Sequence, residues 1–280
     1  MTTRSRSRRA RAPHRPSTTP ATLLGLSVAL AVATVLAQIA YPLSSGSTLR
    51  WLTITTVLLF AGACTLHAAA TRGFLWAASL VLLTGGISLA AEAVGVRTGL
   101  PFGRYAYADT LGPQVLDVPV IVPLAWVMMT YPCLLLGRRL SRAAARRGRR
   151  AAPSSVVTVL TAGLTLASWD LFLDPQMVAA GHWRWADPTP ALPGVPGIPL
   201  TNYAGWVLVS LVLMAVLELL LPVGRREPEG VPGALLAWTW IGSVVGNAVF
   251  FDRPDVAWWG GVAMGLLVVP YLYSWWDGRP

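Results

Sequence analysis

The sequence contains no lysine and few charged residues of any kind. Charged residues make up 12% of the 280 positions and hydrophobic residues make up 54%, whereas soluble domains carry about twice this charged fraction. This shortage of charge excludes an ordinary soluble domain. The 22 basic residues, all arginine, contribute to a net charge of +10, but most lie in short runs between apolar segments, as membrane-topology signals do. The composition therefore indicates a polytopic membrane protein without a nucleic-acid partner.

Motifs for metal, nucleotide and nucleophile chemistry are absent as well. With three histidines, one of them His14 in the N-terminal tail, the chain cannot build the histidine clusters of membrane di-iron oxygenases. It also contains no HExxH, GxGxxG, GxxxxGK[ST] or GxSxG pattern. Cys64 and Cys133 lie in apolar segments without CxxC spacing and are predicted to be buried packing residues. We therefore predict no metal site and no cofactor, which leaves acid chemistry by carboxyl groups.

Eight apolar segments follow one another along the chain. Each is close to the ~20 residues that cross the hydrocarbon core of a bilayer. The predicted fold is therefore all-α, a polytopic membrane bundle of about eight transmembrane helices with two long outer loops. Residues 1–20 are predicted to be a disordered, arginine-rich cytoplasmic tail, and residues 21–276 a single transmembrane domain. The predicted spans are Ala21–Tyr41, Trp51–Ala70, Phe74–Val94, Val118–Leu136, Ser154–Leu173, Tyr203–Leu221, Gly233–Phe251 and Val256–Trp275.

The distribution of arginine predicts how the spans are oriented. The tails and connections on one side of the eight spans hold 17 of the 22 arginines, and those on the other side hold 5. Because positive charge is retained in the cytoplasm, both termini are predicted to be cytoplasmic in a multi-pass protein of the cell membrane. The two long loops, about residues 95–117 and 174–202, are then predicted to lie together on the outer face.

Three carboxyl groups lie near the outer ends of predicted spans, although an ionisable group inside a span costs about 2.5–3.5 kcal/mol on insertion scales. Glu92 lies near the end of the third span, and Asp170 and Asp174, four residues apart in the fifth, share one helix face. Pro175 disfavours helix at the preceding residue, so Asp174 is predicted to end this helix. Buried acids need a partner or a function, and these three are the candidate catalytic residues.

A fourth carboxyl group, Glu218, lies near the opposite end of the sixth span. Arg225 or Arg226 follows closely and is predicted to neutralise it. We therefore interpret Glu218 as a structural residue.

The two outer loops supply polar and aromatic candidates. Glycine and proline residues indicate a turn-rich first loop. Its aromatic residues can equally form an interfacial belt at headgroup depth. Arg104 can pair with Glu92 or Asp109 instead of contacting a substrate, and His182 can be a hydrogen-bonded loop residue. The candidates are Arg104, Tyr105, Tyr107 and Asp109 in the first loop and His182, Trp183, Arg184 and Trp185 in the second.

Three long motifs occur in order along the chain: PFGRYAYADTLGPQVLDVPVIVPLAWVMMTYP, ASWDLFLDPQMVAAGHWRW and GIPLTNYAGW. Through them the chain resembles, over about residues 75–275, the carotenoid-biosynthesis integral membrane proteins, the family of the bisanhydrobacterioruberin hydratases and carotenoid 1,2-hydratases. The resemblance implies addition of water, without a cofactor, across the terminal isopropylidene C=C (C-1,2) of an acyclic carotenoid. The product would be a tertiary alcohol.

Hydration of such an alkene requires a proton delivered to carbon, followed by capture of a tertiary cation by water. Asp170, one turn inside the membrane, suits the proton donor, Asp174 could orient the attacking water, and Glu92 is the alternative acid. Tryptophan rings could face the cation, while Arg104 and Asn202 would hold the acidic groups in place. The predicted substrate-binding residues are Arg104, Tyr105, Tyr107, Asp109, Trp169, His182, Trp183, Arg184, Trp185 and Asn202.

Two other functions fit the same residues. Intramembrane carboxyl groups can carry protons or bind headgroups in a transporter or lipid-binding protein. A carotenoid cyclase or isomerase could proceed through the same cation. The predicted partners are an acyclic carotenoid, membrane lipid and other membrane enzymes of carotenoid biosynthesis.

Overall fold

The computed structural model describes residues 18–148, 153–224 and 229–277. Within these residues eight helices are long and apolar enough to cross a membrane, which confirms the predicted eight-span, all-α fold. Helices suit these segments because a helix satisfies all of its own backbone polar groups in lipid. The helices are α1 Thr18–Ala40, α2 Gly46–Arg72, α3 Phe74–Thr98, α4 Ile121–Arg147, α5 Ser155–Ala179, α6 Leu200–Leu220, α7 Gly230–Val245 and α8 Pro254–Asp277. The predicted tail lies outside the described residues except for Thr18–Pro20, which begin α1.

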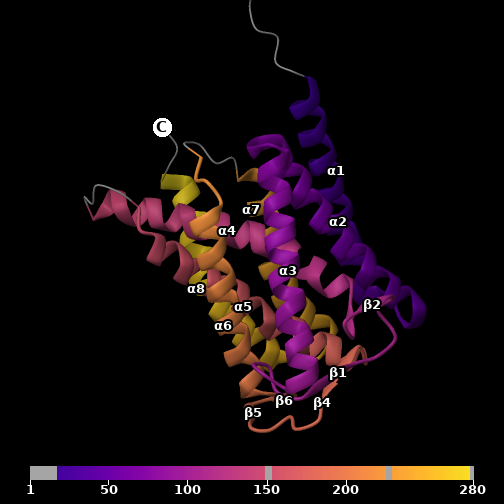
Figure 1. Cartoon of the computed structure of the whole chain (residues 1–280). Helices are drawn as coiled ribbons and strands as arrows, with labels where there is room; N and C mark the ends of the chain where they lie inside the picture. Colours follow the sequence, from indigo (N-terminus) through magenta and orange to yellow (C-terminus); the bar gives the residue numbers. More distant parts are fainter. Residues whose placement is uncertain (1–17, 149–152, 225–228, 278–280) are drawn as a thin grey trace, which may run out of the picture.

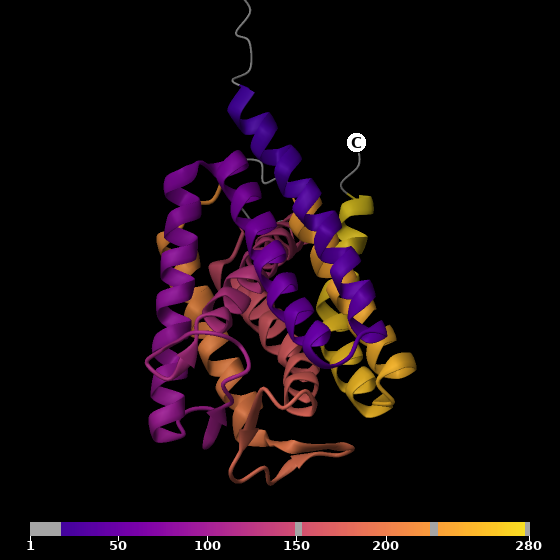
Figure 2. The same ribbon diagram turned by 90° about the vertical axis from the view of Figure 1, so that its right-hand side faces the viewer.

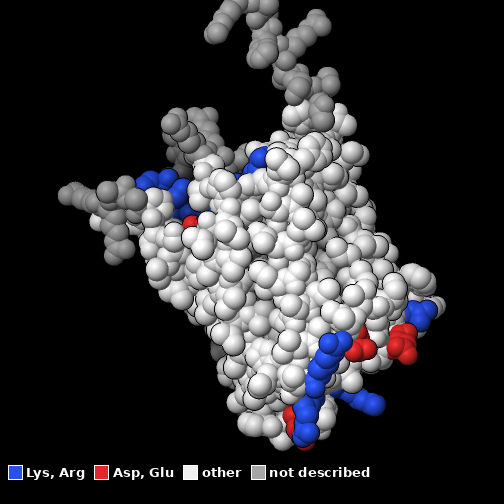
Figure 3. Space-filling view, in the orientation of Figure 1, with Lys and Arg blue, Asp and Glu red and all other residues white. Residues whose placement is uncertain are grey.

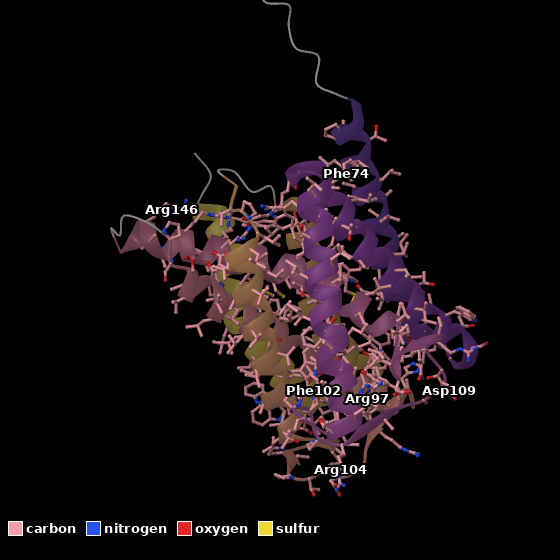
Figure 4. All side chains as sticks on the ribbon, in the orientation of Figure 1. Phe74, Arg97, Phe102, Arg104, Asp109 and Arg146 are labelled. Atoms are coloured by element: carbon pink, nitrogen blue, oxygen red, sulfur yellow. The ribbon has the colours of Figure 1, made fainter. Side chains whose placement is uncertain are left out.

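The two opposite ends of the bundle hold different segments of the chain. The start of α1 and the end of α8 lie at one end, which we name the termini end (Figures 1 and 2). Short strands gather at the opposite end, the hairpin end (Figure 1). On the face seen in Figure 3, charged side chains lie toward these two ends and an uncharged band separates them. Figure 4 places Phe74 and Arg146 toward the termini end and Arg97, Arg104 and Asp109 at the hairpin end. This distribution is the one expected for a bundle that spans a bilayer.

Helix α4 forms the centre of the bundle. It packs against α2, α3, α5, α7 and α8, and most of its residues are buried. Its largest side chains, including Trp126, Tyr131 and Arg138, have less than 2% of their surface exposed. Cys64 and Cys133 are both buried and free, which confirms their predicted role in packing.

The two long loops come together at the hairpin end as antiparallel strand pairs. Strand β1 (Tyr105–Tyr107) of the first loop pairs with β4 (Trp183–Trp185) of the second. This pairing confirms that the two loops lie on the same face. The other pairs are local: β2 (Gln114–Val115) with β3 (Val118–Pro119), and β5 (Ala191–Leu192) with β6 (Val195–Pro199).

The predicted end of the fifth span at Asp174 is wrong. Helix α5 continues through Pro175 to Ala179. Proline removes one backbone donor, but α5 is packed against α4, α6 and α8, and such packing makes an internal proline tolerable in a membrane helix. Asp170 and Asp174 therefore lie in one continuous helix.

Within the described residues, Glu218 pairs with an arginine of another helix. Its Oε2 accepts a hydrogen bond from Nε of Arg138 at 2.8 Å, and both side chains are buried. Arg225 and Arg226 lie outside the described residues. The sequence did not indicate Arg138 as a partner because it precedes Glu218 by 80 residues and meets it only where α4 contacts α6.

Candidate functional site

Asp170 and Asp174 are buried on one face of α5, with 0% and 2% of their surface exposed. Asn202, in the first turn of α6, donates from Nδ2 to Oδ2 of Asp170 at 2.9 Å and to Oδ2 of Asp174 at 2.5 Å. The indole nitrogen of Trp183 donates to Oδ1 of Asp174 at 3.1 Å. The single amide nitrogen of Asn202 thus bridges the two carboxyl groups. The hydrogen-bond donors to this pair of carboxyl groups, an amide and an indole, are therefore both uncharged.

Glu92 on α3 is the third buried carboxyl group of the site. Its Oε2 accepts hydrogen bonds from the hydroxyls of Tyr105 at 2.5 Å and Tyr107 at 2.8 Å. Its Oε1 accepts one from the indole nitrogen of Trp126 at 3.1 Å. Within the described part of the chain the hydrogen bonds to this side chain all come from donors, an arrangement that suits a carboxylate, which can only accept.

The pairing of β1 with β4 positions three of the side chains that donate hydrogen bonds to Glu92 and Asp174, namely Tyr105, Tyr107 and Trp183. Because side chains alternate across a strand, the register that opposes Tyr105 to Trp185 and Tyr107 to Trp183 turns these four rings toward the bundle. Burial and the neighbouring Glu92 raise the pKa of both tyrosine hydroxyls. Both phenols therefore remain protonated and able to donate.

Aromatic rings surround the three carboxyl groups. Trp126 of α4 stacks on Trp206 of α6 with ring centroids 4.1 Å apart and planes at 6°. Trp169 meets the Trp206 ring edge-on at 6.0 Å, and Trp185 donates to the carbonyl oxygen of Phe102 at 2.9 Å. These contacts join rings from three helices and both loops into one apolar wall.

A cavity of about 490 Å³ opens beside these rings. Glu92, Asp174 and Asn202 border it on one side, whereas Asp170 is not among its lining residues. Its lining also includes residues of the end of α1, the 3₁₀ turn η1 (Tyr41–Leu43), α2, α7 and the π-helical turn η2 (Gly246–Phe250). The aromatic residues that line it are Tyr41, Phe60, Phe102, Tyr105, Tyr107, Trp126, Trp169, Phe172, Trp183, Trp185, Trp206, Trp238, Phe250 and Phe251.

Four predicted substrate-binding residues do not line this cavity. Arg104 forms an exposed ion pair with Asp187 at 2.9 Å, which corrects the prediction that it holds Glu92 or Asp109. Asp109 is exposed and accepts from the side chain of Gln114. Arg184 points outward because it alternates with the buried Trp183 and Trp185 on β4.

His182 is the fourth of these residues. It is buried, and its Nδ1 lies 2.8 Å from the hydroxyl of Thr110. Burial, together with the charge of Arg50, lowers the pKa of this imidazole, so it remains neutral. His182 thus holds one loop to the other, as its alternative interpretation predicted.

Most lining residues were not predicted from the sequence, and among the rings that contact the carboxyl groups or one another these include Phe102, Trp126 and Trp206. Trp206 follows Asn202 by four residues, so helical periodicity could have placed both on one face. Trp126 lies in an unbroken apolar segment, where no neighbouring residue distinguishes it from packing residues.

Among the described residues, no group of three or more His, Cys, Asp and Glu side chains is arranged to hold a metal ion. The chemical groups that the site offers are therefore carboxyl, amide, phenol and indole groups around an apolar space.

Comparison with known proteins identifies relatives. Bisanhydrobacterioruberin hydratase of Haloarcula japonica is 37% identical over 141 residues, which cover 50% of this chain and 43% of that protein. No solved structure matches the chain. The family model described as carotenoid biosynthesis protein matches residues 52–269, which is most of the chain and includes every carboxyl group of the site. The chain therefore belongs to the carotenoid biosynthesis protein family.

Proposed function

We propose that this protein hydrates the terminal isopropylidene double bond of an acyclic carotenoid, without a cofactor, to give a tertiary alcohol. The observation that carries the proposal is that Glu92 and Asp174 border one aromatic-lined cavity, and their hydrogen-bond donors are phenol, indole and amide groups. Family membership and the relative named as a hydratase support the same chemistry.

Asp174 is the proton donor in this proposal. Two adjacent buried carboxyl groups cannot both carry a negative charge at low cost, so Asp170 and Asp174 share one proton. Asp174 borders the cavity and Asp170 does not. Asp174 therefore delivers the proton to the less substituted alkene carbon, and Asp170 acts through it as a positioning residue. The amide of Asn202 fixes the two carboxyl groups relative to each other.

Protonation leaves a positive charge on the tertiary carbon. Glu92, already supplied with three donors, remains a carboxylate whose fixed negative charge stabilises this cation. The indole faces of Trp169 and Trp206 add a cation–π attraction worth about 0.5–2 kcal/mol. An aromatic wall suits this task because it stabilises charge without reacting with it.

Water completes the reaction by adding to the tertiary carbon. The O–C bond forms, and one proton of the added water returns to the Asp170–Asp174 pair. The net change is alkene plus water to tertiary alcohol. Neither an oxidant nor a reductant is consumed.

The test uses membranes that contain the chain, an acyclic carotenoid and isotopically labelled water, in the absence of oxygen and reductant. We expect a product heavier by one water, with solvent oxygen in its hydroxyl group and a solvent deuteron on the neighbouring carbon. An absolute requirement for O₂ would refute hydration. A closed ring of unchanged mass would identify a cyclase, and proton-coupled flux with unchanged carotenoids would identify a transporter.

We also propose that the hairpin end faces the outside of the cell and both termini the cytoplasm. The support is the arginine distribution of 17 against 5, together with the location of both described chain ends at the termini end (Figure 2). Reporter domains fused after Ala191 and after Pro280 test this. A reporter that works only in the cytoplasm should be active at Pro280 and inactive at Ala191, and the reverse result would invert the topology.

A further inference from the structure

The lining of the cavity divides into a buried part and an exposed rim. Glu92, Asp174 and Trp206 belong to the buried part. Among the described lining residues, those with an exposed side chain are all apolar and all lie on α1, η1, α7 or η2. They are Ile39, Leu43, Ile241, Val245 and Phe250, each with 45–72% of its surface exposed. The cavity therefore opens between α1 and α7, which contact each other (Figure 2).

The rim lies inside two membrane spans. Helix α1 with η1 forms the span Pro20–Leu43, and α7 with η2 forms the span Gly230–Phe250, and together these contain every residue of the rim. An exposed apolar patch marks a membrane contact or a ligand-binding groove, and inside a span it faces lipid. The cavity thus opens sideways, toward the hydrocarbon core of the bilayer.

Glycine keeps the α7 side of this opening free of side chains. Gly242 and Gly246 both line the cavity, and their spacing of four residues places them on one helix face. The three atoms nearest to a Cβ atom at Gly242 would all belong to Trp238 of the same helix, at 3.6–3.8 Å. This is ordinary van der Waals contact, so the space in front of Gly242 belongs to the cavity and not to a packed interface.

A second glycine pair with the same spacing, Gly261 and Gly265 of α8, packs two helices together. A Cβ atom at these positions would approach Val244 to 3.1 Å and Trp240 to 2.8 Å. The indole nitrogen of Trp240 also donates to the carbonyl oxygen of Gly261 at 2.9 Å. This pair permits the close approach of α8 to α7. The contrast indicates that the glycine pair of α7 serves the cavity instead of helix packing.

The end of α7 is irregular where it borders the opening. The turn η2 is π-helical, a conformation that is rare and frequently found at functional sites. Phe251, which follows it, meets the ring of Tyr41 in η1 edge-on, with ring centroids 6.2 Å apart. Both rings line the cavity. This contact joins the two sides of the rim.

We infer that the polyene enters through this lipid-facing opening and that its chain passes Gly242, with its reacting end at the buried carboxyl groups. Pockets of about 300–1,000 Å³ enclose a drug-sized ligand, and this cavity of about 490 Å³ lies within that range. An acyclic carotenoid is a much longer rod, so the rest of its chain stays in the lipid. Gly242 is thus a specificity-determining residue that admits the methyl-branched polyene. This inference rests on the proposed function in taking a polyene as the ligand.

The test narrows the passage without changing the carboxyl groups. Gly242→Leu adds a side chain where the nearest atoms belong to its own helix, and leucine favours a helix more than glycine does, so the fold should be retained. We expect the variant to bind an acyclic carotenoid about 10- to 100-fold more weakly, the cost of overfilling a packed space. It should bind a short acyclic terpene with the same isopropylidene end as tightly as the unmodified chain does.

Binding is measured without turnover on the detergent-solubilised full chain. The carotenoid should quench tryptophan fluorescence because Trp126, Trp169 and Trp206 border the cavity, and the terpene should raise the unfolding temperature. Ala248→Leu places the same side chain at an exposed position of η2 outside the cavity and should leave both affinities unchanged. Gly242→Ala adds one methyl group and should weaken carotenoid binding about 2- to 5-fold, which preserves the test if leucine prevents folding.

The outcomes separate the passage from the proposed reaction. Unchanged carotenoid affinity in the folded Gly242 variants would overturn the inference. Equal loss of both probes would also overturn it, because the substitution would then close the whole cavity and not a passage from the lipid. Hydration by the unmodified chain with carotenoid affinity insensitive to Gly242→Leu would refute the passage alone. Selective loss of carotenoid binding in Gly242→Leu, without hydration by the unmodified chain, would refute the proposed function alone.

Discussion

Carboxyl groups are buried at both ends of the bundle, but their partners differ. At the termini end, Glu218 accepts from Arg138 at 2.8 Å, and Glu229 lies 3.3 Å from Arg139 and 3.1 Å from Arg142. Each of these carboxylates meets arginine from the central helix α4. These ion pairs join α4 to α6 and to the start of α7, so the carboxylates at this end stabilise the fold.

The buried carboxyl groups at the hairpin end, Glu92, Asp170 and Asp174, have no arginine among their hydrogen-bond partners in the described part of the chain. Glu92 accepts from two phenols and an indole, and Asp174 accepts from an amide and an indole. A buried charge that is not neutralised is costly, and it is tolerated where chemistry uses it. Burial is common to the carboxyl groups at both ends. The structural ones pair with arginine, whereas the proposed functional ones accept hydrogen bonds from uncharged donors.

The largest expected effect is that of Asp174→Asn. The substitution keeps the size and much of the hydrogen bonding but removes the transferable proton, so hydration should fall by about 10²–10⁴-fold, the usual contribution of a general acid. The rate of product formation is measured at equal protein level in membranes. Asp187→Asn, in the exposed pair with Arg104, should keep full activity. Full activity of Asp174→Asn would transfer the acid role to Glu92.

Glu218→Gln should show the opposite behaviour at the termini end. Removing the negative charge that faces the buried Arg138 should cost about 3–5 kcal/mol of stability, while hydration per folded molecule stays unchanged. Thermal unfolding in detergent and specific activity test both parts. The paired change Arg138→Met with Glu218→Leu should restore much of the stability. Loss of specific activity in the folded Glu218→Gln protein would contradict the division between the two ends.

Tyr105→Phe should have a smaller effect on the hairpin end. It removes one of three donors to Glu92, and a hydrogen bond to a charged group contributes about 1.5–3 kcal/mol, so hydration should fall at least about 10-fold. Tyr273→Phe, at an exposed position of α8, is the matched control and should be neutral. An unchanged rate in Tyr105→Phe would argue against Glu92 as the group that stabilises the cation.

The smallest effect is expected for Arg104→Gln. Its ion pair with Asp187 is exposed, with 75% and 67% of the two side chains accessible, and such pairs contribute at most about 1 kcal/mol. Unfolding temperature and hydration rate should both stay close to those of the unmodified protein. A large loss of activity would return Arg104 to the substrate site, as the sequence first suggested.

Several features of this site could be predicted from residue spacing. The spacing of Asp170 and Asp174 placed both on one helix face, and the alternation of the spans with their arginine distribution placed the loops of Tyr105, Tyr107 and Trp183 on the same face. The partner of Arg104 and the outward direction of Arg184 could not be predicted, because both depend on the register between β1 and β4, which joins segments far apart in sequence.

The sequence by itself determined the class of the protein, since apolar segments of spanning length in lipid must become helices whatever their neighbours. It also determined the number of spans and the family-defining motifs. Only the tertiary structure decided which acid borders the cavity, which acid is paired with arginine, and where the aromatic wall stands. Burial and pairing arise from contacts between distant segments, and α5 was able to continue past Pro175 only because three other helices surround it.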